Sequence, residues 1–159
     1  SGPGQASLWS ADRPRVSPPF RFRLEQVLDH RSRREDLMRQ ELAQAMAAVA
    51  AQQERAVAAQ GAVATALAAL RSLMGAPIEL DALRAGHHGL SLLRSRAAHE
   101  RSTVEGLEVV ADERRADLVR ASQEREALVQ LRRTALERHR VEAQRLEGLE
   151  LDELAGRRA

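Results

Sequence analysis

The sequence predicts an all-α fold, namely an antiparallel two-helix coiled-coil hairpin with a short helical connection. Alanine, leucine, glutamate and arginine, which are strong helix formers, dominate the chain, whereas aromatic residues supply only 2% of it. Apolar residues recur at alternating steps of three and four along two long stretches. A single Gly-Ala-Pro break separates these stretches, so each can bury its apolar stripe against the other.

Residues 1–19 precede the first helical pattern. They contain most of the prolines of the chain and two of its nine glycines. Proline and glycine interrupt helices, so no regular structure is expected there. We interpret this segment as a flexible leader, which is either an expression remnant or an extension of the chain.

The first helix is predicted at about residues 22–74. Its seam can be followed from Leu24 to Leu73, and most of the seam positions carry leucine, valine or alanine. Alanine supplies fourteen of the 27 residues between 43 and 69, so the helices can approach closely while burying little area. Pro77 lies just past the end of this pattern, where it cannot continue a helix.

The connection is predicted at residues 75–89. Residues 77–85 form a short helix in this prediction, because proline suits a first helical turn. Gly86 and Gly89 then flank two histidines and separate the short helix from the next pattern. A second seam runs from Leu90 to Leu149, which predicts a second helix at about residues 90–155.

Counting outward from the connection gives a register for the hairpin. It places Leu70 near Leu93, and it places Leu24 near His139. Glu35 then falls opposite residues 125–132 and is expected to pair across the seam, where a polar residue fixes register more than it adds stability. In this register the second helix extends past the start of the first by about a dozen residues, or about 20 Å.

Charge and composition exclude several classes of function. The chain has no lysine, so its pI near 10.6 reflects arginine alone, and the net charge is only +2. Between residues 91 and 159, fourteen arginines are balanced by fourteen carboxylates, which favours a solvated helix face over a nucleic-acid-binding surface. The absence of cysteine excludes disulfides and thiolate metal sites.

Catalysis and membrane insertion are not expected either. The sequence contains no phosphate-binding loop, metalloprotease motif or nucleophile elbow, so we expect no enzymatic activity and no cofactor. His87 and His88 are interpreted as loop residues and not as metal ligands. No apolar run approaches the length of a membrane span or a signal peptide, which predicts a soluble cytoplasmic protein without direct membrane insertion.

Two surfaces are candidates for partner binding. At the start of the first helix, apolar side chains share one face and arginines surround them: Phe20, Leu24, Val27 and Leu28, with Arg21, Arg23 and Arg31. This group is either a binding surface or a hydrophobic staple that packs on the second helix. Farther along, Met46 and Leu67 lie beside the seam, where they either flank the seam or form a docking patch.

Three segments resemble the FliJ family of flagellar export proteins. The sequence FRFRLEQVLDHRSRRED, residues 20–36, is similar to the Phe-x-Phe-Arg-Leu-x-x-Val-Leu pattern with which the family opens. An alanine- and glutamine-rich helix and the connection PIELDALRAGHHGL follow it. The segment ALERHRVEAQRLEGLELDELAGRR is similar to the glutamate-rich end of the family, with its Leu-Asp-Glu-like motif at residues 151–153. The resemblance covers about residues 20–158.

The resemblance implies a soluble, stalk-like component of the flagellar type III export apparatus. Members of the family form an antiparallel coiled coil that contacts the hexameric export ATPase, the membrane export gate and export chaperones. The residues that the resemblance assigns to the ATPase-facing end are Phe20, Phe22, Arg23, Leu24, Arg31, Leu151, Asp152 and Glu153. Met46 and Leu67 are the candidates for the export gate. The implied location is the cytoplasm, peripherally at the inner face of the membrane at the flagellar base.

Two other functions fit the same pattern. A structural coiled coil that associates with itself and has no export role would show the same heptads. A stalk of a virulence-type secretion system would have a similar architecture, although the flagellar motifs at both ends favour the flagellar assignment.

Overall fold

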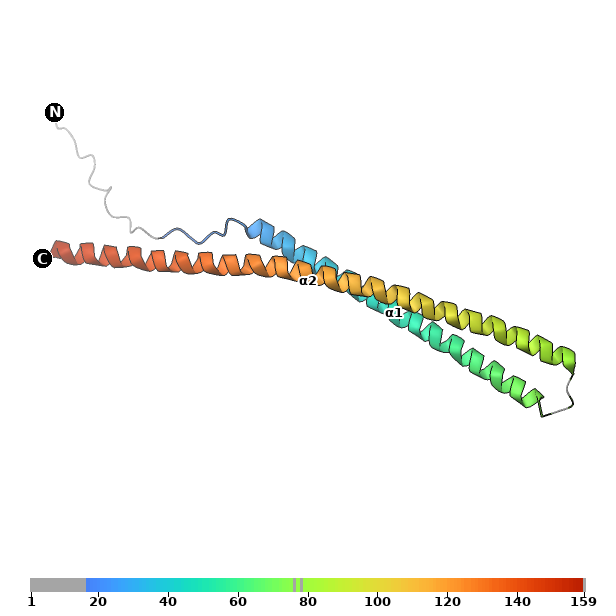
Figure 1. Ribbon diagram of the computed structural model, residues 1–159. Helices are drawn as coiled ribbons and strands as arrows, with labels where there is room; N and C mark the ends of the chain where they lie inside the picture. Colours follow the sequence, from blue (N-terminus) through green and yellow to red (C-terminus); the bar gives the residue numbers. More distant parts are fainter. Residues whose placement is uncertain (1–16, 76, 78, 159) are drawn as a thin grey trace, which may run out of the picture. The chain divides into compact units, whose positions relative to one another are not determined.

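The computed structural model describes residues 17–75, 77 and 79–158, and within these residues all regular structure is helical. The helix α1 spans Glu25–Leu73 (49 residues) and α2 spans Leu80–Arg158 (79 residues). The end of α1 and the start of α2 lie side by side, and the two helices run in opposite directions from there (Figure 1). The prediction of an all-α helical hairpin is confirmed. The predicted leader falls almost entirely on residues 1–16, which lie outside the described residues.

Local chemistry explains both ends of α1. The acidic Glu25 occupies the first turn and Arg71 the last, so each charge complements the helix dipole at its end. The backbone amide of Glu25 donates to the Phe22 carbonyl at 3.1 Å, which closes a turn before the helix. After the helix, the Gly75 amide donates to the Ser72 carbonyl at 3.3 Å.

The helix α2 begins ten residues earlier than predicted, so the expected connection through residue 89 was too long. Gly86 and Gly89 are both helical. The extra turns are stabilised because Leu83 packs against the buried core, and because Gly86 accommodates Leu70. A Cβ atom at Gly86 would lie 2.5 Å from the Leu70 Cδ2 atom, so glycine permits a close approach there.

Contacts divide the described residues into two units. The terminal unit contains residues 17–29 and 126–158, and the central unit contains residues 30–125. The core of the central unit includes a cluster of mostly small side chains from both helices, namely Ala59, Val63, Leu70, Leu90 and Ala97. Small side chains allow close helix packing but bury little apolar area, so specific polar contacts and larger side chains matter more to stability here.

The register differs from the predicted one by one heptad in the central unit. Leu70 lies against Gly86, seven residues before the Leu93 partner that the sequence predicted. The long side chain of Gln52 also reaches Glu100 on α2, which the predicted register placed near Val63 instead. A shift of seven residues keeps the same seam positions on both helices, because the apolar pattern repeats every seven residues. The pattern alone therefore did not distinguish these two registers.

The hydropathy of α1 differs from the expectation that no apolar run approaches the length of a membrane span. A window of 18 residues in this helix reaches a mean hydropathy of 1.4, so its length and composition would allow it to cross a membrane. Only 11% of that window is buried. Alanine, which is abundant here, raises mean hydropathy in soluble helices as well, so this window is only weak support for a membrane span.

Candidate functional site

In the terminal unit, Phe20 is held against α2. Its ring centroid lies 5.6 Å from that of His139, at an interplanar angle of 49°. The guanidinium carbon of Arg132 lies 5.8 Å from the same Phe20 centroid, within the range of a cation–π contact. The contacts agree with the staple interpretation for Phe20.

An ion pair supports the same arrangement. Arg132 Nε donates to Glu25 Oε2 at 3.0 Å, and both side chains are close to half exposed. Arg132 therefore touches the first turn of α1 through its ion pair and the Phe20 ring through its guanidinium. Because one residue of α2 makes both contacts, it positions the segment that precedes α1.

A cleft of about 600 Å³ opens beside these contacts. Its walls include Phe20, Glu25 and Arg132, and also Arg21, Phe22, Arg23 and Gln26. Arg21 and Arg23 are exposed, and neither pairs with an acidic side chain among the described residues. The one carboxylate of the cleft, on Glu25, already pairs with Arg132. The cleft therefore combines aromatic surface with two cationic side chains that remain available.

Two groups of residues were predicted for the ATPase-facing end, one around Phe20 and the other at residues 151–153. In the terminal unit the described contacts do not bring these two groups together. Leu151, Asp152 and Glu153 are exposed on α2. Asp152 is thirteen residues beyond His139 on the same helix, which corresponds to about 20 Å along its axis. The described contacts join the Phe20 segment to Arg132 and His139 instead.

The remaining predicted site residues differ in their availability. Leu24 is half-buried, and Arg31 forms an ion pair with Glu124 in the central unit. Met46 is 52% exposed, as a docking residue must be. Leu67 is half-buried and packs against the core cluster, so it is part of the hairpin interior more than of a free flank.

The central unit contains a buried acidic contact at Glu35. Ser122 Oγ donates to Glu35 Oε1 at 2.8 Å, Arg125 pairs with Oε2, and Arg39 donates to Oε1 at 3.1 Å. The hydrogen bond from Ser122 lowers the pKa of Glu35; burial opposes it, and Arg125 lowers it further. The predicted pairing of Glu35 across the seam is confirmed, although the register differs.

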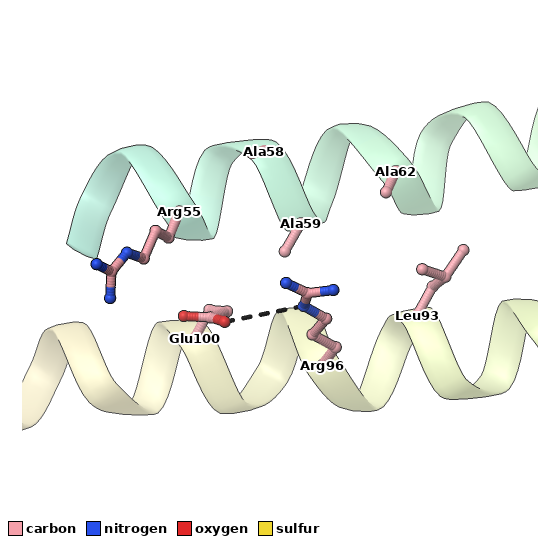
Figure 2. A pocket seen from close by; sticks show the side chains of 7 residues that line it. All are labelled: Arg55, Ala58, Ala59, Ala62, Leu93, Arg96 and Glu100. Atoms are coloured by element: carbon pink, nitrogen blue, oxygen red, sulfur yellow. Dashed lines mark ion pairs between the residues drawn. The ribbon is translucent and has the colours of Figure 1, made fainter. Parts of the chain in front are cut away.

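A second polar contact joins the helices near a small hollow. Gln52 is buried, and its Nε2 atom donates to the Glu100 backbone carbonyl at 3.3 Å and to the Glu100 carboxylate. Beside it, a hollow of about 230 Å³ lies over alanines of α1, and the ion pair between Arg96 and Glu100 borders it (Figure 2). The hollow reflects the small size of alanine at this level of the seam.

Sequence reasoning missed Arg132 and His139 as site residues. They lie seven residues apart within the second seam, and the predicted register placed Leu24, not Phe20, near His139. The heptad spacing could have identified them as one face of α2, whereas the correct register was needed to bring that face to Phe20. Among the residues that the structure describes, no group of three metal-ligating side chains is close enough to hold an ion.

In a comparison with protein families, residues 20–159 match the family described as flagellar FliJ protein. This range includes the Phe20 segment, both helices and the motif at residues 151–153. Searches of curated proteins and of solved structures found no match.

Proposed function

Since this chain belongs to the flagellar FliJ protein family and is therefore a component of the flagellar export apparatus, we propose that it binds the hexameric export ATPase through its terminal unit. In this proposal it is a soluble, stalk-like protein that links the ATPase to the export gate and to export chaperones. It acts in the cytoplasm, peripherally at the inner face of the membrane at the flagellar base.

The observation that carries the proposal is the different setting of the two phenylalanines. Phe20 is occupied by His139 and Arg132, whereas Phe22 has no such ring or cation contact among the described residues and lines the cleft. Phe22 therefore offers aromatic surface beside Arg21 and Arg23. Aromatic and arginine side chains together are typical of residues that dominate the free energy of protein association.

The central unit supports the proposed link to the gate at one position. The Met46 side chain is half exposed, and methionine adapts its shape to different partners. Leu67 supports this role less, because it already packs on the core. The gate contact is therefore centred on Met46 in the proposal.

Substitution of Phe22 tests the ATPase contact. We expect Phe22→Ala to weaken ATPase binding at least about tenfold, since a central aromatic anchor contributes at least about 1.4 kcal/mol. Isothermal titration calorimetry against the purified ATPase measures this change, and far-UV circular dichroism checks that helicity is retained.

Two further variants make the test specific. Leu37→Ala removes a half-exposed apolar side chain from the central unit, and it should leave ATPase affinity unchanged. Phe20→Ala should lower both thermal stability and affinity, because Phe20 positions the segment. If Phe22→Ala and Leu37→Ala both bind as the unsubstituted protein does, the cleft is not the ATPase contact and the proposal is wrong.

A further inference from the structure

In the terminal unit, α2 extends beyond the segment that packs on it. Glu25 forms an ion pair with Arg132. Phe20, five residues earlier in the chain, contacts His139, which is seven residues farther along α2. The segment before α1 therefore runs antiparallel to α2, toward the end of that helix. Nineteen residues of α2 follow His139, which correspond to about 28 Å of helix.

The face of α2 that contacts Phe20 continues over this remaining length. Residues seven apart lie on nearly the same side of a helix, so Leu146 follows His139 on the side that faces Phe20. Ala143 lies four residues after His139 on that side, and both Ala143 and Leu146 are half-buried. We call this continuation the distal face; it includes Ala143, Leu146, Glu147, Glu153 and Leu154.

The distal face combines apolar surface with free acidic side chains. Leu154 is 53% exposed. Glu147 and Glu153 are exposed, and neither pairs with a cation in the part of the chain that the structure describes. Glu150 also lies on this face, and it already has a partner. A segment that covers the distal face must therefore offer apolar and cationic side chains together.

Residues 11–16 of the same chain have this composition. Their sequence, ADRPRV, contains two arginines, one valine and a single carboxylate, and it lies just before the described segment that leads along α2. Pro14 separates the two arginines, and Pro18 and Pro19 follow. Proline restricts the backbone, so a segment of this composition loses less conformational entropy when it docks.

The lengths agree as well. Proline-rich chain in an extended form rises about 3.1 Å per residue, about twice the 1.5 Å rise of an α-helix. Counted back from Phe20 at His139, Val16 then reaches the level of about residue 147 of α2. By the same count, Arg15 and Arg13 reach the levels of about residues 149 and 153. Both arginines therefore come within reach of free carboxylates on the distal face.

We propose that residues 11–16 dock as an extended strap on the distal face of α2. Val16 packs on Leu146, while Arg15 and Arg13 pair with Glu147 and Glu153. The strap covers the part of α2 that extends beyond α1 and the Phe20 segment. Glu153 also belongs to the motif at residues 151–153, so a partner that binds this motif competes with the strap. The docking of the strap does not depend on the ATPase contact, and neither proposal requires the other.

Disulfide cross-linking tests the position of the strap. The chain has no cysteine, so an engineered pair is the only pair present. Val16→Cys combined with Leu146→Cys should cross-link on mild oxidation. Val16→Cys combined with Gln144→Cys should cross-link at least about tenfold more slowly, because positions 144 and 146 differ by about 200° around the helix. Equal rates for the two pairs, or a faster rate for the Gln144 pair, would overturn the proposal.

Charge reversal tests what holds the strap in place. In the cysteine variant of Val16 and Leu146, adding Glu147→Arg and Glu153→Arg should slow cross-linking at least about threefold, because like charges then face each other. Further addition of Arg13→Glu and Arg15→Glu should restore the rate, since the paired charges are then exchanged. Asp152→Arg is the control; it lies on the other side of α2 and should leave the rate nearly unchanged.

The remaining outcomes also decide the question. Glu147, Asp152 and Glu153 are exposed, so these variants should keep their helical circular dichroism. A rate that the reversal of Glu147 and Glu153 does not change would refute the ion pairs. A rate that the reversal slows but the exchanged charges do not restore would refute them as well, because charge complementarity would then not be the cause.

Discussion

Replacement of Glu35 by alanine tests whether a polar contact stabilises a seam that is built largely from alanine. Three side chains donate to the Glu35 carboxylate, two of them from α2 and one from α1. Hydrogen bonds to a charged group contribute about 1.5–3 kcal/mol each, and the loss of one partner of a buried ion pair costs about 3–5 kcal/mol. The substitution therefore removes a buried cross-helix contact of the central unit.

The partial exposure of the two arginines places the expected cost below the about 3–5 kcal/mol of a fully buried ion pair. The side chain of Glu35 is 8% exposed, but those of Arg125 and Arg39 are 31% and 59% exposed. Both arginines recover contact with water when the carboxylate is removed, so neither becomes an unpaired buried charge. We expect Glu35→Ala to reduce the free energy of unfolding by about 2 kcal/mol, which for a chain of this size lowers the Tm by about 4–8 °C.

Urea denaturation followed by circular dichroism measures this loss. Asp36→Ala is the matched control, because Asp36 pairs with the same Arg39 but from a side chain that is 65% exposed. The control should change stability by no more than about 0.5 kcal/mol. If Glu35→Ala proves as mild as Asp36→Ala, the seam contact is not stabilising, and the argument from burial is wrong.

The pH dependence of the same contact provides an independent check. The pKa of Glu35 lies below its ordinary value of 4.5 in the folded protein, chiefly because Ser122 donates to the carboxylate. A lowered folded-state pKa means that the stabilisation is present above the unfolded-state pKa and is lost as the pH falls through the folded-state pKa. The stability difference between the unsubstituted protein and Glu35→Gln should therefore be full at pH 7 and should shrink below about pH 4. An unchanged difference at low pH would contradict this assignment.

Two more predictions concern the register. Gly89→Ala should stabilise the protein by about 0.5–1 kcal/mol, because no atom lies near the added Cβ. Gly86→Ala should stabilise less or destabilise, because its Cβ would meet the buried side chain of Leu70. Thermal denaturation of the two variants compares their stabilities. Cysteines in place of Ala59 and Ala97, which share the buried core cluster, should form a disulfide on mild oxidation, whereas cysteines in place of Ala59 and Val104, which face each other in the register expected from the sequence, should not. Non-reducing electrophoresis measures this cross-linking, and a disulfide in the Ala59–Val104 variant instead would support the expected register.

The sequence was sufficient for the fold class because helix propensity, heptad spacing and the Gly-Ala-Pro break all agree. It was misleading at Gly86 and Gly89, where two glycines were read as the end of a helix. Glycine weakens a helix by about 1 kcal/mol, but packing of Leu83 and Leu70 offsets that cost. Tertiary contacts therefore decided where α2 begins.

The register could not be derived from periodicity, since a shift of one heptad leaves the seam intact. The contacts that distinguish the registers are the pairing of Gln52 with Glu100 and the fit of Leu70 against Gly86. The same limit applied to the candidate site. Phe20 and Phe22 were identified from their motif, but Arg132 and His139 became partners of Phe20 only once the register was known.

The anchoring of Phe20 also has a consequence for proteolysis. Residues 17–20 have no regular structure, and Arg21 and Arg23 are exposed and precede the first residue of α1. Trypsin cleaves after lysine or arginine in chain that can adopt an extended form, and this chain has no lysine. Cutting after Arg23 would separate both phenylalanines from α1 at a single peptide bond, while Phe20 kept only its noncovalent contacts with α2. The amount of this fragment that dissociates after a brief digestion would therefore report how firmly the contacts of Phe20 hold the segment on α2.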